Sequence, residues 1–428
     1  MSAAREPIAV IGTGYVGLVT AAGFAELGSE VWCVDIDADK IARLKRGEIP
    51  IYEPGLTECV ATNRERLHFT TELAPALEHA RLLFVAVGTP PTYSGDADLS
   101  AVRAVVDAMP SSDSHALVMK STVPVGTGAA IRRTLIERGK GGFAYVSCPE
   151  FLKEGSALED FRHPDRVVVG DDGDWAGDAV IELYSPLDAP LVRTDIASAE
   201  MIKLAANAFL ATKISFINEI ANVCEETGAD VLEVARGMGL DRRIGTHFLK
   251  PGIGFGGSCF PKDVSALKQL AGNSGYHFQL LTAVIEVNEL QKRRVIGKLQ
   301  KHLGSLVGRS VTLLGLAFKA NTDDMREASS LVLAARLQAD GASVRAYDPI
   351  AEREARKMMV GVQFADRALD AVADADACVI VTEWPEFAEL DWTEVAKRMR
   401  GNLVIDGRNF VEPDAVRAAG FIYEGIGR

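Results

Sequence analysis

The chain has 428 residues, 48% hydrophobic and 25% charged, a composition typical of a globular protein with two or three domains. Its 46 Lys and Arg against 59 Asp and Glu give a formal net charge of −13, which argues against nucleic acid or an anionic membrane surface as a partner. No apolar run approaches the roughly 18 residues that span a bilayer. The six cysteines form no C-x-x-C pair, so we expect no metal site, no disulfide framework and a cytoplasmic protein.

Short apolar runs alternate with longer helical patterns through the first 200 residues, which is the signature of a parallel sheet covered by helices. The expected strands are Ile8–Ile11, Val31–Val34, Leu82–Val87, Ala116–Met119 and Phe143–Val146. We take residues 1–197 as the first domain.

A glycine motif, Gly12-x-Gly14-x-x-Gly17, directly follows the first expected strand and opens a helix, and Asp35 ends the second strand. Such glycines allow a tight turn and close approach of the backbone to a pyrophosphate, which then faces the helix N-terminus. Asp35 can accept both ribose hydroxyls and would repel a 2′-phosphate. The pattern favours NAD over NADP; the alternative is a purely structural turn.

Polar residues also follow three of the later expected strands. Thr89 and Thr122 come after two of them, where ligands of parallel sheets bind, although both segments also read as ordinary turns. Glu150 and Glu154 follow the next strand and would share a face if the segment were helical. Surface carboxylates that only solvate a helix are the alternative.

The middle of the chain, residues 198–303, reads as helical. From Ser198 to about Thr227 there is no Pro or Gly, which predicts one long helix. Its apolar positions recur around most of the circumference, so we expect it to be buried between domains or against a second copy of the chain. Lys203 and Asn207 lie one turn apart on it, and must either meet solvent or find a partner.

A glycine-rich loop, residues 251–259, interrupts these helical patterns and delivers Cys259 next to Lys262 and Asp263. Nearby ammonium groups favour a thiolate, so this cysteine reads as a nucleophile. The other cysteines in or beside strands read as inert buried side chains, namely Cys33, Cys148 and Cys378.

Strand and helix alternate again in residues 304–428. The expected strands are Val311–Gly315, Val344–Asp348, Cys378–Val381 and Leu403–Asp406. The order echoes the first domain, since Asp348 ends a second strand as Asp35 does, and a proline turn follows the third strand at Pro90 and Pro385. We therefore predict an α/β protein with two Rossmann-like doubly wound lobes joined by a long central helix and a helical middle domain.

Taken together, the motifs resemble the UDP-glucose/GDP-mannose dehydrogenase family over essentially the whole chain. The resemblance rests on Gly12 to Gly17 with Asp35, Pro149-Glu150-Phe151-Leu152 with Glu154-Gly155, Lys203 with Asn207, Gly256 to Asp263, and Gly315 to Lys319 leading to Thr322 to Arg326. One departure is Ala328-Ser329-Ser330, where the family often has a Pro; we expect this to affect only the local helix start.

The resemblance implies oxidation of a sugar C6 alcohol to a carboxylate with two NAD, and the form of the cysteine motif points to UDP-glucose. By resemblance, the catalytic residues are Cys259, Lys203, Asp263, Asn207, Thr122 and Glu150. The cofactor-binding residues are Gly12, Gly14, Tyr15, Val16, Gly17, Asp35, Lys40, Thr89, Thr122, Glu154, Lys262 and Arg326. The substrate-binding residues are Glu150, Phe151, Leu152, Lys153, Glu154, Lys203, Asn207, Arg243, Phe248, Leu249, Lys250, Pro251, Gly252, Gly256, Lys319 and Arg408. Arg243 matches a position that reaches substrate across a subunit interface, which fits a homodimer formed through the central helix.

Two other functions stay open at this point. A two-electron dehydrogenase would use the same cofactor lobe without a thiol and would yield one NADH per substrate. A nucleotide-sensing protein would bind both ligands and turn over neither. The combination of Cys259, Lys203 and Asp263 favours the thiol enzyme over both.

Overall fold

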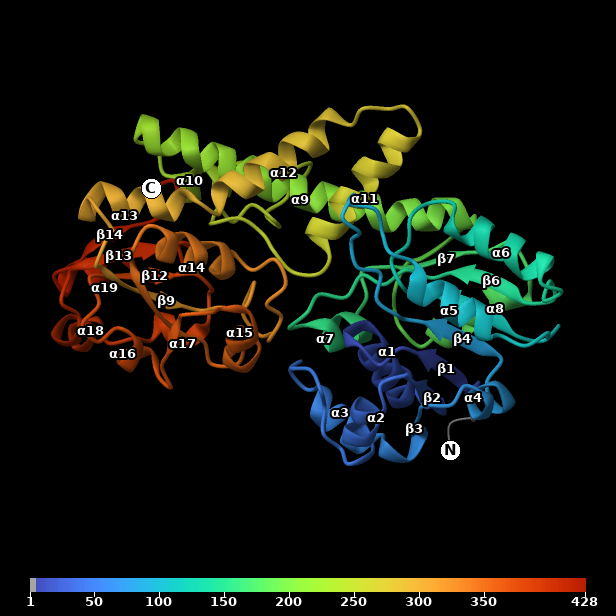
Figure 1. The fold of residues 1–428 in the computed structure, drawn as a ribbon. Helices are drawn as coiled ribbons and strands as arrows, with labels where there is room; N and C mark the ends of the chain where they lie inside the picture. The colour runs from blue at the N-terminus through green and yellow to red at the C-terminus, as the bar shows by residue number, and fades with distance from the viewer. Residues whose placement is uncertain (1–4) are drawn as a thin grey trace. The chain divides into compact units, whose positions relative to one another are not determined.

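The computed structural model describes residues 5–428 and divides into two compact units (Figure 1). The first comprises the chain up to Ala206 together with Gln269–Gly275, and the second comprises Asn207–Lys268 and Tyr276–Arg428. Helices α9 (Ile196–Thr227) and α11 (Phe260–Asn273) contribute residues to both. Within residues 5–428, no helix combines the length and the apolar character needed to cross a membrane.

The first unit is built on an eight-stranded sheet with the order β3-β2-β1-β4-β5-β6-β7-β8. Its first six strands have the order of the dinucleotide-binding fold, and only β6 and β7 pair antiparallel. The strands are β1 (Ile8–Ile11), β2 (Val31–Val34), β3 (Leu67–Thr70), β4 (Leu82–Val85), β5 (Ala116–Met119), β6 (Ala144–Ser147), β7 (Val167–Gly170) and β8 (Leu191–Thr194).

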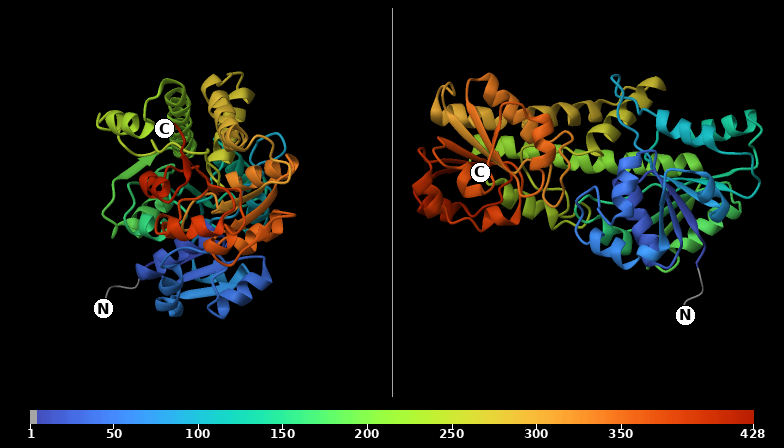
Figure 2. Two further views of the ribbon diagram at one scale, coloured as in Figure 1. Left: turned by 90° about the vertical axis from the view of Figure 1, so that its left-hand side faces the viewer. Right: turned by 60° about the horizontal axis from the view of Figure 1, so that its bottom comes forward.

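Helices cover both faces of this sheet (Figure 2), so its central strands are apolar at every position. In β1, Ile8 and Val10 enter one core while Ala9 and Ile11 enter the opposite one. The helices are α1 (Tyr15–Glu26), α2 (Ala38–Lys45), α3 (Leu56–Thr62), α4 (Ala74–His79), α5 (Ser100–Ala108), α6 (Thr127–Glu137), α7 (Ala157–Arg162) and α8 (Trp175–Tyr184), with a 3₁₀ turn at Arg64–Arg66.

The second unit repeats the same strand order in a six-stranded, wholly parallel sheet, β11-β10-β9-β12-β13-β14. The similarity that the sequence predicted between the two lobes is therefore a shared strand order. Its strands are β9 (Ser310–Leu314), β10 (Ser343–Tyr347), β11 (Gln363–Phe364), β12 (Ala377–Ile380), β13 (Leu403–Asp406) and β14 (Ile422–Glu424).

Alternate residues of this second sheet also enter two cores. One face packs on the C-terminal part of α9, on α10 (Val231–Gly239) and on α13 (Arg294–Leu303) through residues such as Ile217, Val231 and Val295. The other packs on Trp384, Trp392 and their neighbours. The remaining helices are α10 (Val231–Gly239), α12 (Gln279–Gln291), α13 (Arg294–Leu303), α14 (Ser329–Ala339), α15 (Glu352–Met358), α16 (Ala368–Ala371), α17 (Pro385–Ala388), α18 (Trp392–Arg398) and α19 (Pro413–Ala418).

The structure confirms the predicted α/β class, both lobes and the long helix, and it corrects three local expectations. The Glu150 to Glu154 segment is a loop, and α7 begins only at Ala157, so the two carboxylates do not share a helical face. Pro385 is the first residue of α17 and not part of a turn. The backbone N–H at this position has no partner within a helix, so a proline is well tolerated there. Strands β3, β8, β11 and β14 were not predicted because they are short or carry polar residues, and the apolar strand β7 was overlooked.

Candidate active site

The glycine turn between β1 and α1 meets the steric demands of a dinucleotide site. Gly12 has φ +96°, and a Cβ there would lie 2.6 Å from the Ala86 carbonyl oxygen. A Cβ at Gly17 would lie 1.8 Å from the Gly12 oxygen, whereas Gly14 faces open space. Within the described chain no side chain caps α1 at Gly14, so its first amides stay available to an anion. These features fit a bound NAD pyrophosphate.

Asp35, directly after β2, is held as an anion beside this turn. Its carboxylate accepts hydrogen bonds from the Thr13 amide (2.8 Å), the Thr13 hydroxyl (2.7 Å) and the Asp37 amide (3.0 Å). Lys40 adds an ion pair at 2.9 Å. Burial acts to raise the pKa of Asp35, but these hydrogen bonds outweigh it and hold the pKa below its usual value. An ionised carboxylate at this place suits the ribose hydroxyls of NAD.

The equivalent residue of the second lobe, Asp348, has a different role. Its Oδ2 accepts from the amides of Leu316 and Ala317 and from the Trp384 indole, and its Oδ1 accepts from two further amides. The side chain is fully committed to the turn after β9, with 2% of the residue exposed. The two lobes thus share a topology, but only Asp35 lies beside an open glycine turn.

Two predicted threonines meet at the carboxyl ends of β4 and β5. The Thr89 hydroxyl donates to the Thr122 carbonyl over 2.9 Å. Lys120, close by in sequence and not predicted as a site residue, is buried and donates to the Tyr184 hydroxyl (2.9 Å) and to Cys148 Sγ (3.6 Å). Its position directly after an expected strand was the available signal.

Glu150 and Lys203 form a buried ion pair, and this answers the question that the sequence left open about Lys203. Their Oε1 and Nζ atoms are 2.9 Å apart, and each side chain is only 4% exposed. The other Glu150 oxygen accepts the Leu152 amide at 2.5 Å. The pair positions a carboxylate that can take a proton next to an ammonium that can stabilise an oxyanion.

The Phe151 ring, next to Glu150, lies under two cations. The Arg166 guanidinium carbon is 3.5 Å from the ring centroid, and Lys203 Nζ is 5.3 Å from it. Burial lowers the pKa of Arg166. Arg166 and Lys120 both line a small cavity of about 80 Å³ with Glu150, so Arg166 is a second residue that sequence reasoning missed.

The loop that carries Glu150 and Glu154 is fixed by another overlooked acid, Glu53. Its two oxygens accept the amides of Gly155 (2.6 Å) and Ala157 (2.7 Å). The Tyr15 hydroxyl also accepts the Gly155 amide, at 2.8 Å. Lys153 pairs with Asp160 at 2.9 Å. The loop is therefore held to Glu53 and to Tyr15, the first residue of α1.

In the second unit, Asn207 and Asp263 form a second buried polar cluster, in addition to the Glu150–Lys203 pair of the first unit. Asn207 Nδ2 donates to Asp263 Oδ2 over 2.6 Å, and Lys262 pairs with the other oxygen of Asp263. Asp263 is fully buried, and its amide donates to the Cys259 carbonyl at 2.8 Å, so Cys259 stands at the start of α11. The positive end of a helix dipole favours negative charge on a group placed there, and Cys259 occupies that place at α11.

None of the six cysteines, all of which lie in the described chain, forms a disulfide, and Cys259 differs from the others in being only half-buried. Burial raises the pKa of Cys33, and it raises that of Cys378 to about 12. These buried thiols are protonated at neutral pH, as the sequence predicted. Among residues 5–428, no three His, Cys, Asp or Glu side chains are grouped so that they could hold a metal ion.

The glycine-rich loop before Cys259 is buried, and side chains from neighbouring helices hold its backbone. Asn218 accepts the Gly252 amide (2.8 Å), Gln291 donates to the Gly252 carbonyl (2.9 Å), and Asn288 bonds both polar groups of Phe255. A Cβ at Gly256 would lie 2.2 Å from the Glu327 oxygen. The loop therefore needs its glycines for close backbone packing.

Arg408 joins this loop to the second sheet. Its Nη1 donates to the Gly254 carbonyl (2.9 Å) and its Nε to the Val381 carbonyl (2.8 Å), and burial lowers its pKa.

In contrast, Arg243 is 89% exposed and pairs only with neighbouring Asp241 in the described chain. Ser329, in the segment that departs from the family, begins α14 and donates to the Ile253 carbonyl at 3.0 Å.

The other predicted substrate and cofactor residues of this unit lie around the same loop. Lys319 lies 5.4 Å from the Phe318 ring centroid, and Arg326 pairs with Asp324 while its carbonyl accepts the Gly257 amide. Phe248 has φ +63°, which marks a constrained backbone where the loop begins.

Comparison with known proteins agrees with this geometry. Three family models match: the NAD binding domain (residues 6–188), the central domain (197–290) and the UDP binding domain (312–413) of the UDP-glucose/GDP-mannose dehydrogenase family. The chain is 49% identical to the UDP-glucose 6-dehydrogenase TuaD of Bacillus subtilis, covering 99% of this chain and 93% of that protein. It is 48% identical to the UDP-glucose 6-dehydrogenase of Pseudomonas aeruginosa, covering 98% and 97%. A solved UDP-glucose dehydrogenase from Pyrobaculum islandicum superimposes with a TM-score of 0.91 at 38% identity, covering 100% and 98%. The chain therefore belongs to the UDP-glucose/GDP-mannose dehydrogenase family and is an NAD-dependent oxidoreductase.

Proposed function

We propose that this enzyme oxidises the C6 alcohol of UDP-glucose to the carboxylate of UDP-glucuronate through covalent intermediates on Cys259. The observation that carries this proposal is a half-buried thiol at the start of α11, after a buried glycine loop and beside Lys262 and Asp263. The names of the relatives support UDP-glucose as the substrate. Bound NAD would accept a hydride in each of two oxidation steps.

The thiol is needed because the first oxidation yields an aldehyde. The Cys259 thiolate adds to the aldehyde carbon and forms a thiohemiacetal, which retains the C–H bond that is broken in the second oxidation. The resulting thioester is then cleaved by water, which releases the carboxylate and returns the thiol. Without a covalent bond to the enzyme, the aldehyde could dissociate before the second oxidation.

We assign the polar residues around this chemistry by what each can donate or accept. Lys203 stabilises the substrate oxygen as negative charge develops, and Asn207 donates a hydrogen bond to the same oxygen. Lys203 and Asn207 are one turn apart on α9, so both can address one substrate group. Glu150, ion-paired to Lys203, takes the proton of the hydrolytic water, and Thr122 and Asp263 orient that water.

We propose that residues 1–197 hold NAD, residues 198–303 carry the thiol, and residues 304–428 hold the UDP group. On the cofactor side, Gly12 to Gly17, Asp35, Lys40, Thr89, Glu154, Lys262 and Arg326 would bind NAD. For the substrate diphosphate, the donors are the backbone of the 248–256 loop with Lys319 and Arg408. We further propose a reducing, cytoplasmic location, which the lack of disulfides among the six cysteines of the described chain supports.

We also propose a homodimer formed through α9. Phe209, Phe216 and Val223 recur every seven residues on this helix and are 66%, 48% and 57% exposed. Large apolar side chains in such a row favour packing against another helix. The exposed Arg243 would then reach the substrate of the partner chain. Phe209→Glu with Phe216→Glu should halve the mass found by light scattering, whereas Ile136→Glu, at an exposed residue of α6, should leave it unchanged.

Replacement of the thiol tests the reaction itself. With limiting UDP-glucose the wild-type enzyme should release two NADH per sugar and no free aldehyde. Cys259→Ser should lower turnover by roughly 10⁴-fold, because a serine hydroxyl is hardly ionised at neutral pH. Cys59→Ser is the matched control, since Cys59 is buried and its thiol donates to the Ala22 carbonyl, which a hydroxyl can also do. One NADH per sugar, or full turnover by Cys259→Ser, contradicts the covalent route.

A further inference from the structure

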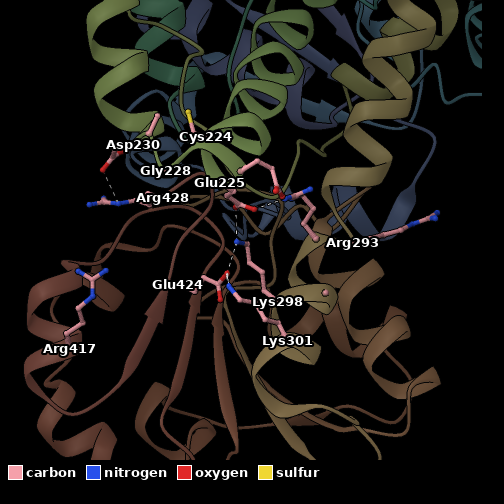
Figure 3. Close-up of a pocket in the computed structure, with 14 residues that line it drawn as sticks. Cys224, Glu225, Gly228, Asp230, Arg293, Lys298, Lys301, Arg417, Glu424 and Arg428 are labelled. Atoms are coloured by element: carbon pink, nitrogen blue, oxygen red, sulfur yellow. Dashed lines mark hydrogen bonds and ion pairs between the residues drawn. The ribbon is translucent and has the colours of Figure 1, made fainter.

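The second unit contains a cavity of about 790 Å³ that the proposed reaction does not use (Figure 3). It lies among the C-terminal end of α9, the start of α10, α13, α19 and the segment from β14 to the C-terminal residue. None of the cofactor, substrate or catalytic residues proposed above is among the described residues that line it. Its volume is in the range of small-molecule sites.

The inner wall of the cavity is a charge-balanced network. Lys298 Nζ lies between two carboxylates, 2.8 Å from Glu225 and 3.0 Å from Glu424, and Arg294 also pairs with Glu225 at 2.5 Å (Figure 3). Burial acts to raise the pKa of Glu225, but Lys298, a backbone amide and Arg294 outweigh it and lower the pKa. Burial likewise acts to raise the pKa of Glu424, but hydrogen bonds from His302 and Lys298 outweigh it and lower the pKa. Both acids are therefore ionised and already paired with cations. The Nε of Arg294 is buried without a hydrogen-bond partner in the described chain.

The rim of the cavity, in contrast, has cations in excess. Lys301 on α13, Arg417 on α19 and Arg428 come from three separate parts of the chain. Among the described residues, Lys301 is 67% exposed and lies 3.3 Å from Glu424, and Arg428 lies 3.5 Å from Asp230. Arg417 forms an ion pair with Asp414, which is 90% exposed, and its guanidinium carbon lies 5.3 Å from the Tyr423 ring centroid. Pairs this exposed or this long contribute little, so these cations stay available to a stronger partner.

The local charge opposes that of the whole protein. The basic lining residues are Arg293, Arg294, Lys298, Lys301, Arg417 and Arg428, and the acidic ones are Glu225, Glu226, Asp230 and Glu424. Six basic against four acidic side chains leave an excess of two positive side-chain charges, which the backbone carboxylate of Arg428 reduces to one, in a chain whose net charge is −13. A positive cavity on an acidic protein concentrates anions.

We propose that this cavity is a second anion site that binds a small phosphorylated metabolite, apart from the cofactor and substrate sites. Guanidinium groups match phosphate oxygens with paired N–H donors, and Lys301 adds a point charge. A phosphate among Lys301, Arg417 and Arg428 would meet three cations while the inner acids remain neutralised by Lys298 and Arg294. This goes beyond the proposed function, which needs no ligand here.

Inorganic pyrophosphate is the probe that tests the site. Calorimetric titration into the full chain, saturated with NAD and UDP so that those sites are filled, should show one further saturable site per chain. Arg417→Ala with Arg428→Ala should weaken this binding by at least about tenfold, which corresponds to about 1.4 kcal/mol. Arg132→Ala is the control, because Arg132 on α6 also forms an exposed ion pair, with Asp172.

Arg417→Ala alone keeps the test decisive if the double variant folds poorly, since its side chain is 54% exposed and its ion pair is external. It should weaken pyrophosphate binding measurably while turnover of UDP-glucose stays unchanged. Absence of a further saturable site in the wild-type chain overturns the proposal. Unchanged pyrophosphate affinity in folded Arg417→Ala overturns it as well, because the rim cations would then serve only local ion pairs.

Discussion

Asp35 and Lys40 together predict how cofactor preference responds to substitution. Asp35→Ser removes the anion that accepts the ribose hydroxyls and leaves Lys40, now 2.9 Å from that carboxylate, without its counter-ion. Loss of a hydrogen bond to a charged acceptor costs about 1.5–3 kcal/mol, so kcat/KM for NAD should fall by about 10- to 150-fold.

For NADP the same change is favourable. Two like charges about 4 Å apart repel by about 4 kcal/mol at an effective dielectric constant of about 20. Lys40 is 28% exposed, and screening at such a site reduces the gain to about 2 kcal/mol, or roughly 30-fold. The freed Lys40 ammonium adds attraction for the 2′-phosphate. The ratio of kcat/KM for NAD over that for NADP should therefore change by about 10³-fold.

Steady-state absorbance at saturating UDP-glucose measures both values of kcat/KM. Asp35→Ser with Lys40→Ala should show the same loss with NAD but a smaller gain with NADP, which isolates the contribution of Lys40. An NADP value unchanged within about threefold, in a variant that keeps the wild-type melting temperature, would refute this account of Asp35.

Three further outcomes are expected. Gly12→Ala should lower the melting temperature and NAD affinity, because its Cβ would lie 2.6 Å from the Ala86 oxygen; Gly47→Ala shares a positive φ but meets nothing within 4 Å, so it should cost clearly less. Glu150→Gln cannot take a proton from water, so it should accumulate an acyl adduct on Cys259 that intact-mass spectrometry detects, whereas Cys259→Ser should not. Glu225→Gln should lower the free energy of unfolding by about 1.5–3 kcal/mol at pH 7. Because the pKa of Glu225 is lowered by folding, its stabilisation is fully present above the unfolded value of about 4.3 and is lost as the pH falls through the lower folded-state pKa, so wild-type and variant should converge in denaturant titrations at acidic pH.

Local pattern alone determined much of this protein. Every residue of β1 and β4 is buried, because helices cover both faces of a parallel sheet, and a continuous apolar run reports that directly. The positions of Gly12, Gly17 and Asp35 were equally readable, since the steric demand of a tight turn admits few residue types. The buried thiols followed from their place in strands.

Only the tertiary structure decided which polar groups meet. Glu150 lies 53 residues from Lys203, and Asp263 lies 56 from Asn207, yet each pair is in direct contact. Helical periodicity shows that Lys203 and Asn207 share a face, but it cannot show which anion compensates a buried ammonium, because that depends on how distant segments pack.

The same reason separates the two lobes and explains the second cavity. Asp35 and Asp348 follow equivalent strands. The sequence does not show that the Asp348 carboxylate accepts hydrogen bonds from the Leu316 and Ala317 amides and from the Trp384 indole. The rim cations are likewise far apart in the chain, and only folding brings α13, α19 and the end of the chain around one space. Short-range pattern records which residues are buried, whereas the partners of buried charges are set by chain topology.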